Sequence, residues 1–274
     1  MRTIVVPTDF SDNALYAATY ASGLAGRLNA RLVLLHVYQM PAPVPEVPLP
    51  YPVDDVEKDI QSQLNQLKER LISQGKGLTE IQTVIRSGEV VTEIKKYCEE
   101  INPYSIIMGA ESAGAMERLL FGGKTLSALR NLSWPLIIVP PFNLFNGIRK
   151  VGLACDFREV IGTVRAAEIR DLVKEFGAEL HVLYISDEEA DDLSADTVEE
   201  SGWLQEMLSD LKPQYHFLKH PDIESGILDY SRSNNLDLLI VIPKKHSLVE
   251  RIFNRSHSKN LVLHAPVPVL SLHE

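Results

Sequence analysis

Short apolar runs without polar alternation recur along the chain, separated by longer stretches in which apolar residues follow a helical period. Such runs indicate strands that are buried on both faces, as in a parallel sheet covered by helices. The clearest helical stripe consists of Val56, Ile60, Leu64, Leu67 and Leu71. The expected strands include TIVVP (3–7), RLVLLHV (31–37), YSIIMG (104–109), PLIIVP (135–140), KVGLAC (150–155), ELHVLYI (179–185), LDLLIVI (236–242) and PVPVLSL (266–272).

The pattern runs through the chain twice, and this internal repeat is the most informative feature of the sequence. IVVPTDF (4–10) and VGLACDF (151–157) lie 147 residues apart, and RLVLLHV and ELHVLYI lie 148 apart. From residue 85 onward the offset is 133, so that Pro135 corresponds to Pro268. Both halves therefore carry the same series of strands and helices.

Each half is expected to hold five strands alternating with helices, with Ser11 and Asp12 supplying the N-terminal cap of the first helix. Right-handed crossovers then predict an α/β fold with a doubly wound, five-stranded parallel sheet in each half. We place the first domain at 1–142 and the second at 148–274, joined by the short connector FNLFNGIR (142–149).

The change in offset from 148 to 133 means that the first half carries 15 additional residues between its second and third strands. The segment QMPAPVPEVPLPYPV (39–53), with six prolines, accounts for them. Proline fixes φ and removes a hydrogen-bond donor, which predicts an extended surface loop with polyproline II character. The loop is either a stiffened connector or a lid or docking strip for a partner.

Composition describes a globular chain with a full core, since 45% of the 274 residues are hydrophobic and 23% are charged. The net charge of -10 argues against nucleic acid as the main partner. No apolar run approaches the ~20 residues that span a bilayer, and Asp9 stands where a signal peptide would be apolar. Two cysteines, Cys98 and Cys155, imply no disulfide framework. We therefore expect a cytoplasmic protein that binds neither nucleic acid nor membrane.

The tripeptide Gly123-Lys124-Thr125 suggests a phosphate-binding P-loop, which needs a further glycine five positions before Gly123. That position holds Arg118, so the P-loop is excluded. In an open parallel sheet, a ligand lies beyond the carboxyl ends of the strands, where the winding direction reverses. If the first and fourth strands flank that point, Pro7-Thr8-Asp9 and Met108-Gly109 face each other there.

Two stretches, VVPTDFSDNALYAATYA and ERLLFGGKTLSALRNLSWPLIIVP, resemble the universal stress protein family, and the resemblance covers both halves, as in a tandem member. ATP-binding members carry Gly-x-x-Gly, nine residues and Gly-Ser/Thr after the fourth strand. Gly109 and Gly122 lie 13 apart, as that spacing requires. The second glycine position is Ser112, however, and the Ser/Thr position is Gly123, with Thr125 two residues further on. The motif is therefore kept in spacing and changed at two positions.

The resemblance implies that the first half binds ATP or a related adenine nucleotide. Asp9, Thr8 and the backbone of Val37 belong to the adenosine and ribose side, and Met108 is either the floor of an adenine pocket or plain core. Asp9 also fits an Asx-type cap on the following helix, and Gly109 and Gly122 also fit ordinary strand-end and helix-cap glycines. The expected nucleotide-binding residues are Pro7, Thr8, Asp9, Val37, Met108, Gly109, Ser112, Gly122, Gly123, Lys124 and Thr125.

Physical roles can be assigned to the polar end of this site. A glycine at position 109 lets the backbone approach a ribose or phosphate, and we expect a bulky residue there to block binding without disturbing the fold. Gly122 and Gly123 would offer backbone N–H groups at a helix N-terminus, and Lys124 a positive charge toward a phosphate.

In the second half the positions that correspond to Gly109, Ser112, Gly122 and Gly123 hold larger residues, namely Ile242, Lys245, Arg255 and Ser256. Asp156 remains. The basic stretch 243–260 either holds an anion through its side chains or fills the old pocket with internal salt bridges. His216, His220, His246 and His257 show no metal-binding spacing, and no Ser/His/Asp or Cys/His motif is present, so we expect neither a metal site nor catalysis.

Three functions compete. The first is a stress-response protein in which nucleotide occupancy changes interactions with protein partners that the sequence does not identify. The second is a nucleotide-free scaffold of the same fold. The third, an enzyme of phosphoryl or adenylyl transfer, is the weakest, because such chemistry needs metal-held carboxylates and only Asp9 lies near the site.

The final strands of the two halves generate a prediction about how the halves join. An apolar edge strand invites pairing with another strand. We expect the final strands (135–140 and 266–272) to lie antiparallel as an internal pseudo-two-fold pair, burying Ile137, Val139, Val269 and Leu270; further homodimerisation of the whole chain is compatible with this. The isolated first half should then self-associate. A stable monomer in light scattering would contradict this arrangement.

Overall fold

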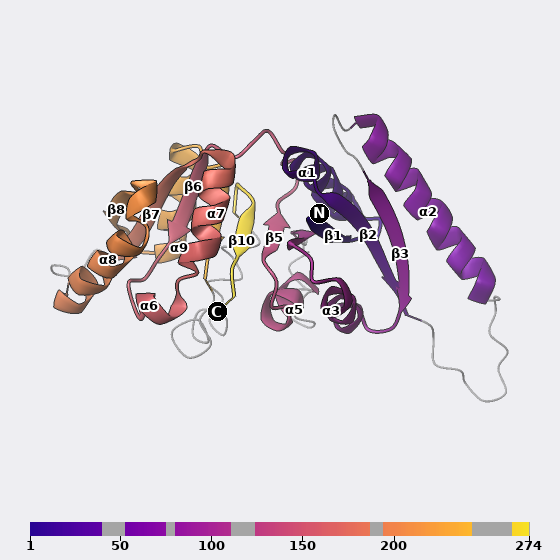
Figure 1. The fold of residues 1–274 in the computed structure, drawn as a ribbon, viewed down its shortest axis with the longest axis horizontal. Helices are drawn as coiled ribbons and strands as arrows, with labels where there is room; N and C mark the ends of the chain where they lie inside the picture. Colours follow the sequence, from indigo (N-terminus) through magenta and orange to yellow (C-terminus); the bar gives the residue numbers. More distant parts are fainter. Residues whose placement is uncertain (40–52, 75–79, 111–123, 187–193, 243–264, 274) are drawn as a thin grey trace. The chain divides into compact units, whose positions relative to one another are not determined.

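The structure, a computed structural model, describes residues 1–39, 53–74, 80–110, 124–186, 194–242 and 265–273 (Figure 1). It divides into two compact units, Met1–Asn146 and Gly147–Glu274, at a point inside the predicted connector. Ser112, Gly122, Gly123, the basic stretch 243–260 and nearly all of the proline-rich segment lie outside the described residues.

The first unit alternates strands with helices, as the apolar pattern predicts. Helices α1 and α2 pack against each other on the sheet, and α3 packs against α5 (Figure 1). The described elements are β1 (Thr3–Pro7), α1 (Asp12–Leu28), β2 (Arg31–Tyr38), α2 (Val53–Gln74), β3 (Ile81–Ser87), α3 (Val90–Ile101), β4 (Ser105–Gly109), α5 (Lys124–Asn131) and β5 (Leu136–Val139).

The five strands of the first unit form a parallel sheet in the order β3-β2-β1-β4-β5. The chain moves outward from β1 through β2 to β3 and then crosses to β4 on the other side of β1. The winding direction therefore reverses between β1 and β4, as predicted. Their register pairs Val5 with Ile106, so the segments that follow both strands emerge side by side.

The core of this unit follows from the apolar runs. Leu32 to Leu35 of β2 are all at most 1% exposed, which is the two-sided burial expected of a central parallel strand. Four of the five residues of the predicted stripe on α2 are buried, and Val56 is half-buried. The predicted cap of α1 is confirmed, because the Ser11 hydroxyl accepts a hydrogen bond from the backbone of Ala14.

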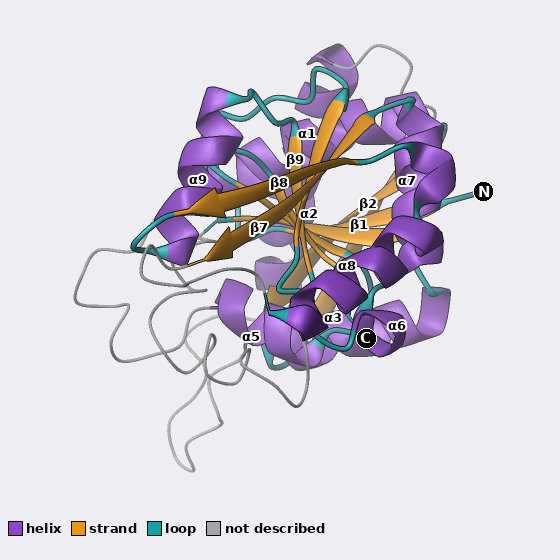
Figure 2. Ribbon diagram, turned by 90° about the vertical axis from the view of Figure 1, so that its left-hand side faces the viewer, coloured by secondary structure: helices purple, strands orange, loops and turns teal. Residues whose placement is uncertain are grey.

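The second unit repeats the parallel sheet, with neighbours in the order β8-β7-β6-β9-β10. Figure 2 shows β7 and β8 with α9 on one side and α7 and α8 on the other. Its elements are β6 (Lys150–Ala154), α6 (Val160–Thr163), α7 (Ala166–Phe176), β7 (Glu179–Ser186), α8 (Ala195–Met207), the short 3-10 helix η1 (Ser209–Leu211), β8 (Gln214–Lys219), α9 (Ile223–Ser233), β9 (Leu238–Val241) and β10 (Val269–Ser271).

The first helix is where the two units differ most. The long α1 of the first unit is replaced by the single turn α6 and the separate helix α7, divided at Val164, which is extended. Glu159 precedes α6 with a left-handed backbone and does not cap the helix with its own side chain, as Ser11 caps α1; the Val160 N–H donates instead to the Glu200 carboxylate of α8 at 2.8 Å. The β-branched residues and Gly162 in the first turns disfavour one continuous helix.

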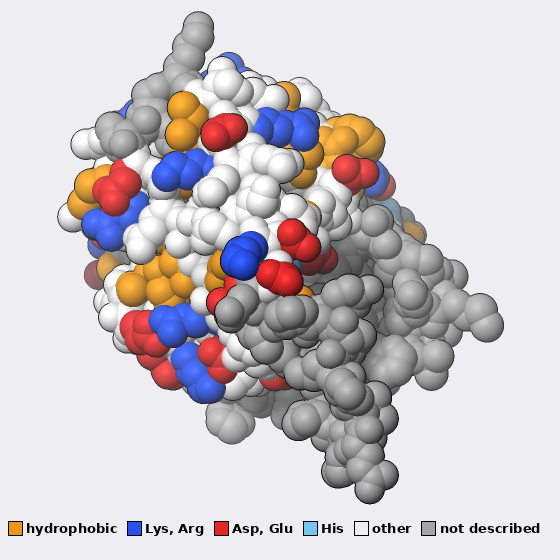
Figure 3. Space-filling view, turned by 90° about the vertical axis from the view of Figure 1, so that its right-hand side faces the viewer, with side chains coloured by type: hydrophobic (Ala, Val, Ile, Leu, Met, Phe, Trp, Pro, Cys, Tyr) orange, Lys and Arg blue, Asp and Glu red, His pale blue; other side chains and the backbone are white. Residues whose placement is uncertain are grey.

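On the face shown in Figure 3, acidic and basic side chains are interspersed rather than gathered by sign. The described part of this face therefore presents no single-sign field. No described helix is long and apolar enough to cross a membrane. The pairing of the final strands remains a prediction.

Candidate functional site

The turn after β1 lies at the switch point and is held by its own side chains. The backbone N–H of Thr8 donates to the Leu35 carbonyl, and the Thr8 hydroxyl accepts from the Phe10 N–H at 3.1 Å. One carboxylate oxygen of Asp9 accepts from the Ser11 N–H at 3.1 Å and from the Ser11 hydroxyl at 2.6 Å. Asp9 is thus the Asx-type cap that sequence reasoning gave as one alternative, while its side chain stays exposed at the carboxyl edge.

An aromatic pair braces this turn, and neither member was among the residues predicted from the sequence. Phe10 has a left-handed backbone, with φ of 64°, and its ring stacks on His36 with centroids 4.7 Å apart. The His36 Nδ1 lies 2.8 Å from the Thr8 carbonyl oxygen. Since a carbonyl only accepts, Nδ1 carries the hydrogen. His36 therefore fixes the end of β2 to the end of β1.

The end of β4 lies beside this turn, but the group that approaches Gly109 closely belongs to the protein and is not the expected ribose or phosphate. A Cβ added at Gly109 would lie 2.4 Å from the Asn13 carbonyl oxygen in the first turn of α1. The close approach that requires glycine is therefore made by the protein's own helix. Met108 is 8% exposed, which favours plain core over the floor of an adenine pocket.

The start of α5 is tied to the same strand end. Thr125 is 1% exposed, and its hydroxyl donates to the Gly109 carbonyl at 3.3 Å. A helix N-terminus carries unpaired backbone N–H groups and partial positive charge. α5 begins at Lys124, so this end lies beside the carboxyl edge of β4.

The structure thus gathers most of the predicted site residues that it describes. Pro7, Thr8 and Asp9 come from β1 and its turn, Val37 from the end of β2, and Met108 and Gly109 from β4, with Lys124 and Thr125 at the start of α5. The side chain of Lys124 lies outside the description, as do Ser112, Gly122 and Gly123.

The second unit repeats the backbone N–H contacts of the turn, with a cysteine sulfur in place of the threonine hydroxyl. The Phe157 N–H contacts the Cys155 sulfur at 3.4 Å, and the Arg158 N–H donates to Asp156 at 3.2 Å. Phe157 again has a left-handed backbone, with φ of 47°, and stacks on Tyr184, the counterpart of His36. Asp156 therefore keeps a structural task in a half whose glycine positions are occupied by larger residues.

Comparison with known proteins identifies the repeated unit. The model of the universal stress protein family matches residues 1–140 and again residues 163–273. The chain belongs to the universal stress protein family. It contains two copies of the family's domain, as the internal repeat predicts.

Individual relatives agree with this assignment. Universal stress protein MJ0531 of Methanocaldococcus jannaschii is 26% identical over 144 residues, 50% of this chain and 81% of its own. The crystal structure of a universal stress protein from Archaeoglobus fulgidus covers 99% of this chain and 96% of its own, with 21% identity and a TM-score of 0.76. The latter shows the fold alone. A universal stress protein in complex with cAMP covers 51% of this chain and 97% of its own, with 24% identity and a TM-score of 0.43.

In the second domain of this universal stress protein, aromatic rings fill the region beside the turn. Phe157 is 2% exposed and stacks with Tyr184, Tyr215 and Phe217, at centroid distances between 5.3 and 6.5 Å. Burial raises the pKa of Tyr215 to about 12. At the other strand end stands Ile242 in place of a glycine. The first domain has the smaller Gly109 and His36 at the positions of Ile242 and Tyr184, while Phe10 matches Phe157 in size.

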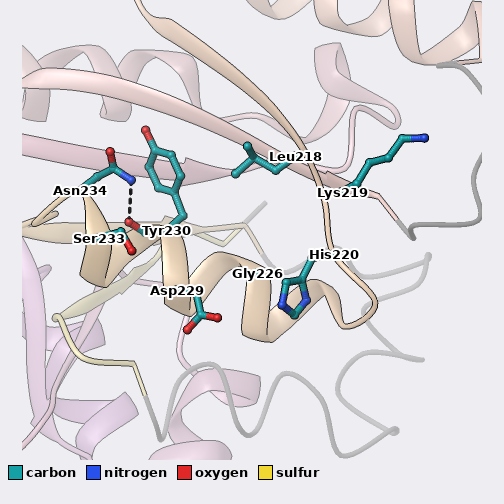
Figure 4. A pocket seen from close by; sticks show the side chains of 8 residues that line it. All are labelled: Leu218, Lys219, His220, Gly226, Asp229, Tyr230, Ser233 and Asn234. Atoms are coloured by element: carbon teal, nitrogen blue, oxygen red, sulfur yellow. Dashed lines mark hydrogen bonds between the residues drawn. The ribbon is translucent and has the colours of Figure 1, made fainter.

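The second domain also has an open groove of about 280 Å³ away from the switch point, between β8 and α9 (Figure 4). It is smaller than most small-molecule sites, and Figure 4 shows its polar side chains pointing in different directions. The groove is lined by Leu218, Lys219, His220, Gly226, Asp229, Tyr230, Ser233 and Asn234.

No group of three or more His, Cys, Asp or Glu in the described residues could hold a metal ion.

Gly109 yields a stability prediction that corrects the sequence-based one. Gly109→Ala places a Cβ 2.4 Å from backbone, so α1 must move, and we expect unit 1 to lose about 1–3 kcal/mol of unfolding free energy. A bulky residue would therefore disturb the fold as well as any site. Calorimetry should show a lower melting temperature for this variant.

The matched control is Gly202→Ala in α8, where an added Cβ meets nothing within 4 Å. That change should leave the melting temperature unchanged or raise it slightly, because alanine favours a helix. Equal melting temperatures for Gly109→Ala and the unmodified chain would refute the packing role of Gly109.

Proposed function

We propose that the first domain binds ATP or a related adenine nucleotide at the carboxyl ends of β1 and β4, and that occupancy changes interactions with protein partners. The observation that carries this proposal is the switch-point geometry. An exposed carboxylate, Asp9, is held in a fixed turn beside the end of β4 and the N-terminus of α5. Sequence composition leads us to propose the cytoplasm as the location.

The groups at this edge match the two ends of a nucleotide. Asp9 is oriented by two hydrogen bonds from Ser11, which suits a carboxylate that accepts from ribose hydroxyls. The N-terminus of α5 suits phosphate oxygens, because its backbone N–H groups point out of the helix and its dipole favours negative charge. The adenine would lie along the ends of β1 and β2, near Val37.

The second domain fits such a ligand less well. Its strand end carries Ile242 where the first domain has Gly109, and the larger Tyr184 takes the place of His36 beside the turn. We therefore assign the nucleotide to the first domain only.

A scaffold without nucleotide is the second candidate, and two observations favour it. Gly109 is already occupied by the approach of α1, and the family motif is changed at Ser112 and Gly123. Phosphoryl transfer has less support, since the described part of the site offers Asp9 as its one carboxylate at the strand ends, and a metal clamp needs more.

Calorimetric titration of the full chain with ATP tests the proposal. We expect saturable binding and a rise in melting temperature, since ligand at a hundred-fold excess over its Kd adds ~2.7 kcal/mol to the stability of the folded state. The absence of both heat and thermal shift would favour the scaffold.

A matched pair of variants locates the site. Asp9→Asn keeps an acceptor for Ser11 but removes the charge, and should weaken ATP binding about ten-fold or more, since a hydrogen bond to a charged group is worth ~1.5–3 kcal/mol. Asp156→Asn makes the same change in the second domain and should leave affinity unchanged. Equal effects of the two variants on affinity would exclude a site confined to the first domain.

A further inference from the structure

Two histidines and a tyrosine meet inside the second domain, away from the switch point. His181 of β7 is 5% exposed, and its Nδ1 lies 3.1 Å from Nε2 of His216 on β8 and 3.1 Å from the Tyr230 hydroxyl on α9. The two imidazole rings are inclined by only 18°, with centroids 5.2 Å apart. One nitrogen atom therefore connects three elements.

The groups around this nitrogen come from every element packed on it. Nε2 of His181 is also buried, with the Glu179 carboxylate of the same strand 3.5 Å away, and the Lys150 ammonium acts from β6. Burial lowers the pKa of His181, and Lys150 adds to this while Glu179 opposes it. Burial, and then the neighbouring His181, lower the pKa of His216.

The hydrogen-bonding groups around His181 and His216 limit how many protons the two imidazole rings can hold. With both rings neutral, the lone pair of His181 Nδ1 accepts from the two groups that lie 3.1 Å from it, the Tyr230 hydroxyl and the Nε2–H of His216. One added proton also fits, because His181 then donates from Nδ1 to His216, and its positive charge faces the Glu179 carboxylate 3.5 Å from Nε2. A second proton does not fit, since it places N–H against N–H and charge against charge across 3.1 Å.

We propose that His181, His216 and Tyr230 form a proton-sensitive latch that holds β8 and α9 on the second domain, and that a second proton on the histidine pair opens it. The two rings titrate as a coupled pair rather than as separate sites. With two protons bound, the rings must separate, and the separation removes a side-chain contact that adds to the backbone pairing of β8 with β7 and ties α9 to both strands.

The position of the latch determines what it releases. β8 pairs only with β7 among the described strands, so nothing else in the sheet holds its outer side. Tyr230 also lines the groove between β8 and α9 (Figure 4), so the same movement would reshape that groove. Edge strands with few partners are the elements that open locally at low free energy.

The sign of the pH effect follows from the lowered pKa values. In the open state the histidines regain their ordinary pKa of about 6.5, whereas in the closed state they resist protonation. The closed state is therefore fully favoured above about pH 6.5. The population of the closed state decreases as the pH falls from 6.5 toward the lowered pKa of the histidine pair, because the open state binds more protons.

Hydrogen exchange of the full chain, followed by mass spectrometry between pH 7.5 and 5 and corrected for intrinsic rates, tests the latch. Protection of β8 and α9 should fall by up to about ten-fold per pH unit for each proton taken up, while β1 and β2 stay unchanged. His216→Gln keeps a hydrogen-bonding side chain but takes up no proton, and should remove this dependence.

His220→Gln is the matched control, because it removes a histidine next to β8 whose ring nitrogen contacts the backbone of Asp222 and not the cluster. It should leave the pH dependence intact. Constant protection in the unmodified chain, or the same loss in His216→Gln, would overturn the proposal. If His216→Gln fails to fold, the titration of the His181 and His216 imidazoles in the unmodified chain, followed by NMR, tests the latch instead. Two coupled steps support the latch, and two independent titrations near pH 6.5 refute it.

Discussion

The turn after the first strand is the constraint on which the carboxyl edge of each unit depends. As the chain leaves β1, the side chains of Thr8 and Asp9 satisfy the backbone N–H groups of Phe10 and Ser11. This arrangement requires the unfavourable left-handed conformation of Phe10, which the stack on His36 helps to offset. The turn sets the direction of α1, so that the Asn13 backbone packs against Gly109 at the end of β4. Together with the contact of His36 with the Thr8 carbonyl, this packing fixes the ends of β1, β2 and β4 relative to one another.

Comparison of the two units shows which residues at the carboxyl edge the turn itself needs, apart from any ligand. Asp156 accepts from the backbone N–H two residues on, as Asp9 does, and Phe157 has the same left-handed backbone as Phe10, although Ile242 stands where the first unit has Gly109. An aspartate at this place is thus required by the fold whether or not a nucleotide binds. What distinguishes the first unit at this edge is Gly109 in place of Ile242 and His36 in place of Tyr184 against the phenylalanine ring.

Most of the fold could be predicted because its signals are local. Apolar runs indicate buried strands, the stripe from Ile60 to Leu71 indicates a helix, and Ser11 marks a helix start. The candidate site was predictable only in outline. The partner of Gly109 is Asn13, far away in sequence, so spacing alone could not distinguish a ligand from the protein's own helix. Likewise, His181 and His216 meet only through the register of β7 with β8, which no short-range pattern encodes.

The two units therefore have different means of responding to their surroundings. In the first, the ionisable group at the carboxyl edge is exposed and oriented, which suits a ligand that arrives from solvent. In the second, the turn phenylalanine stacks on further aromatic rings, and the closely coupled ionisable groups are the buried His181 of β7 and the half-buried His216 of β8. Burial makes these groups energetically costly to charge, so their protonation, and any change that depends on it, responds to pH. The nucleotide site and the proton-sensitive latch that we propose therefore rest on two sets of groups that share no residue or element.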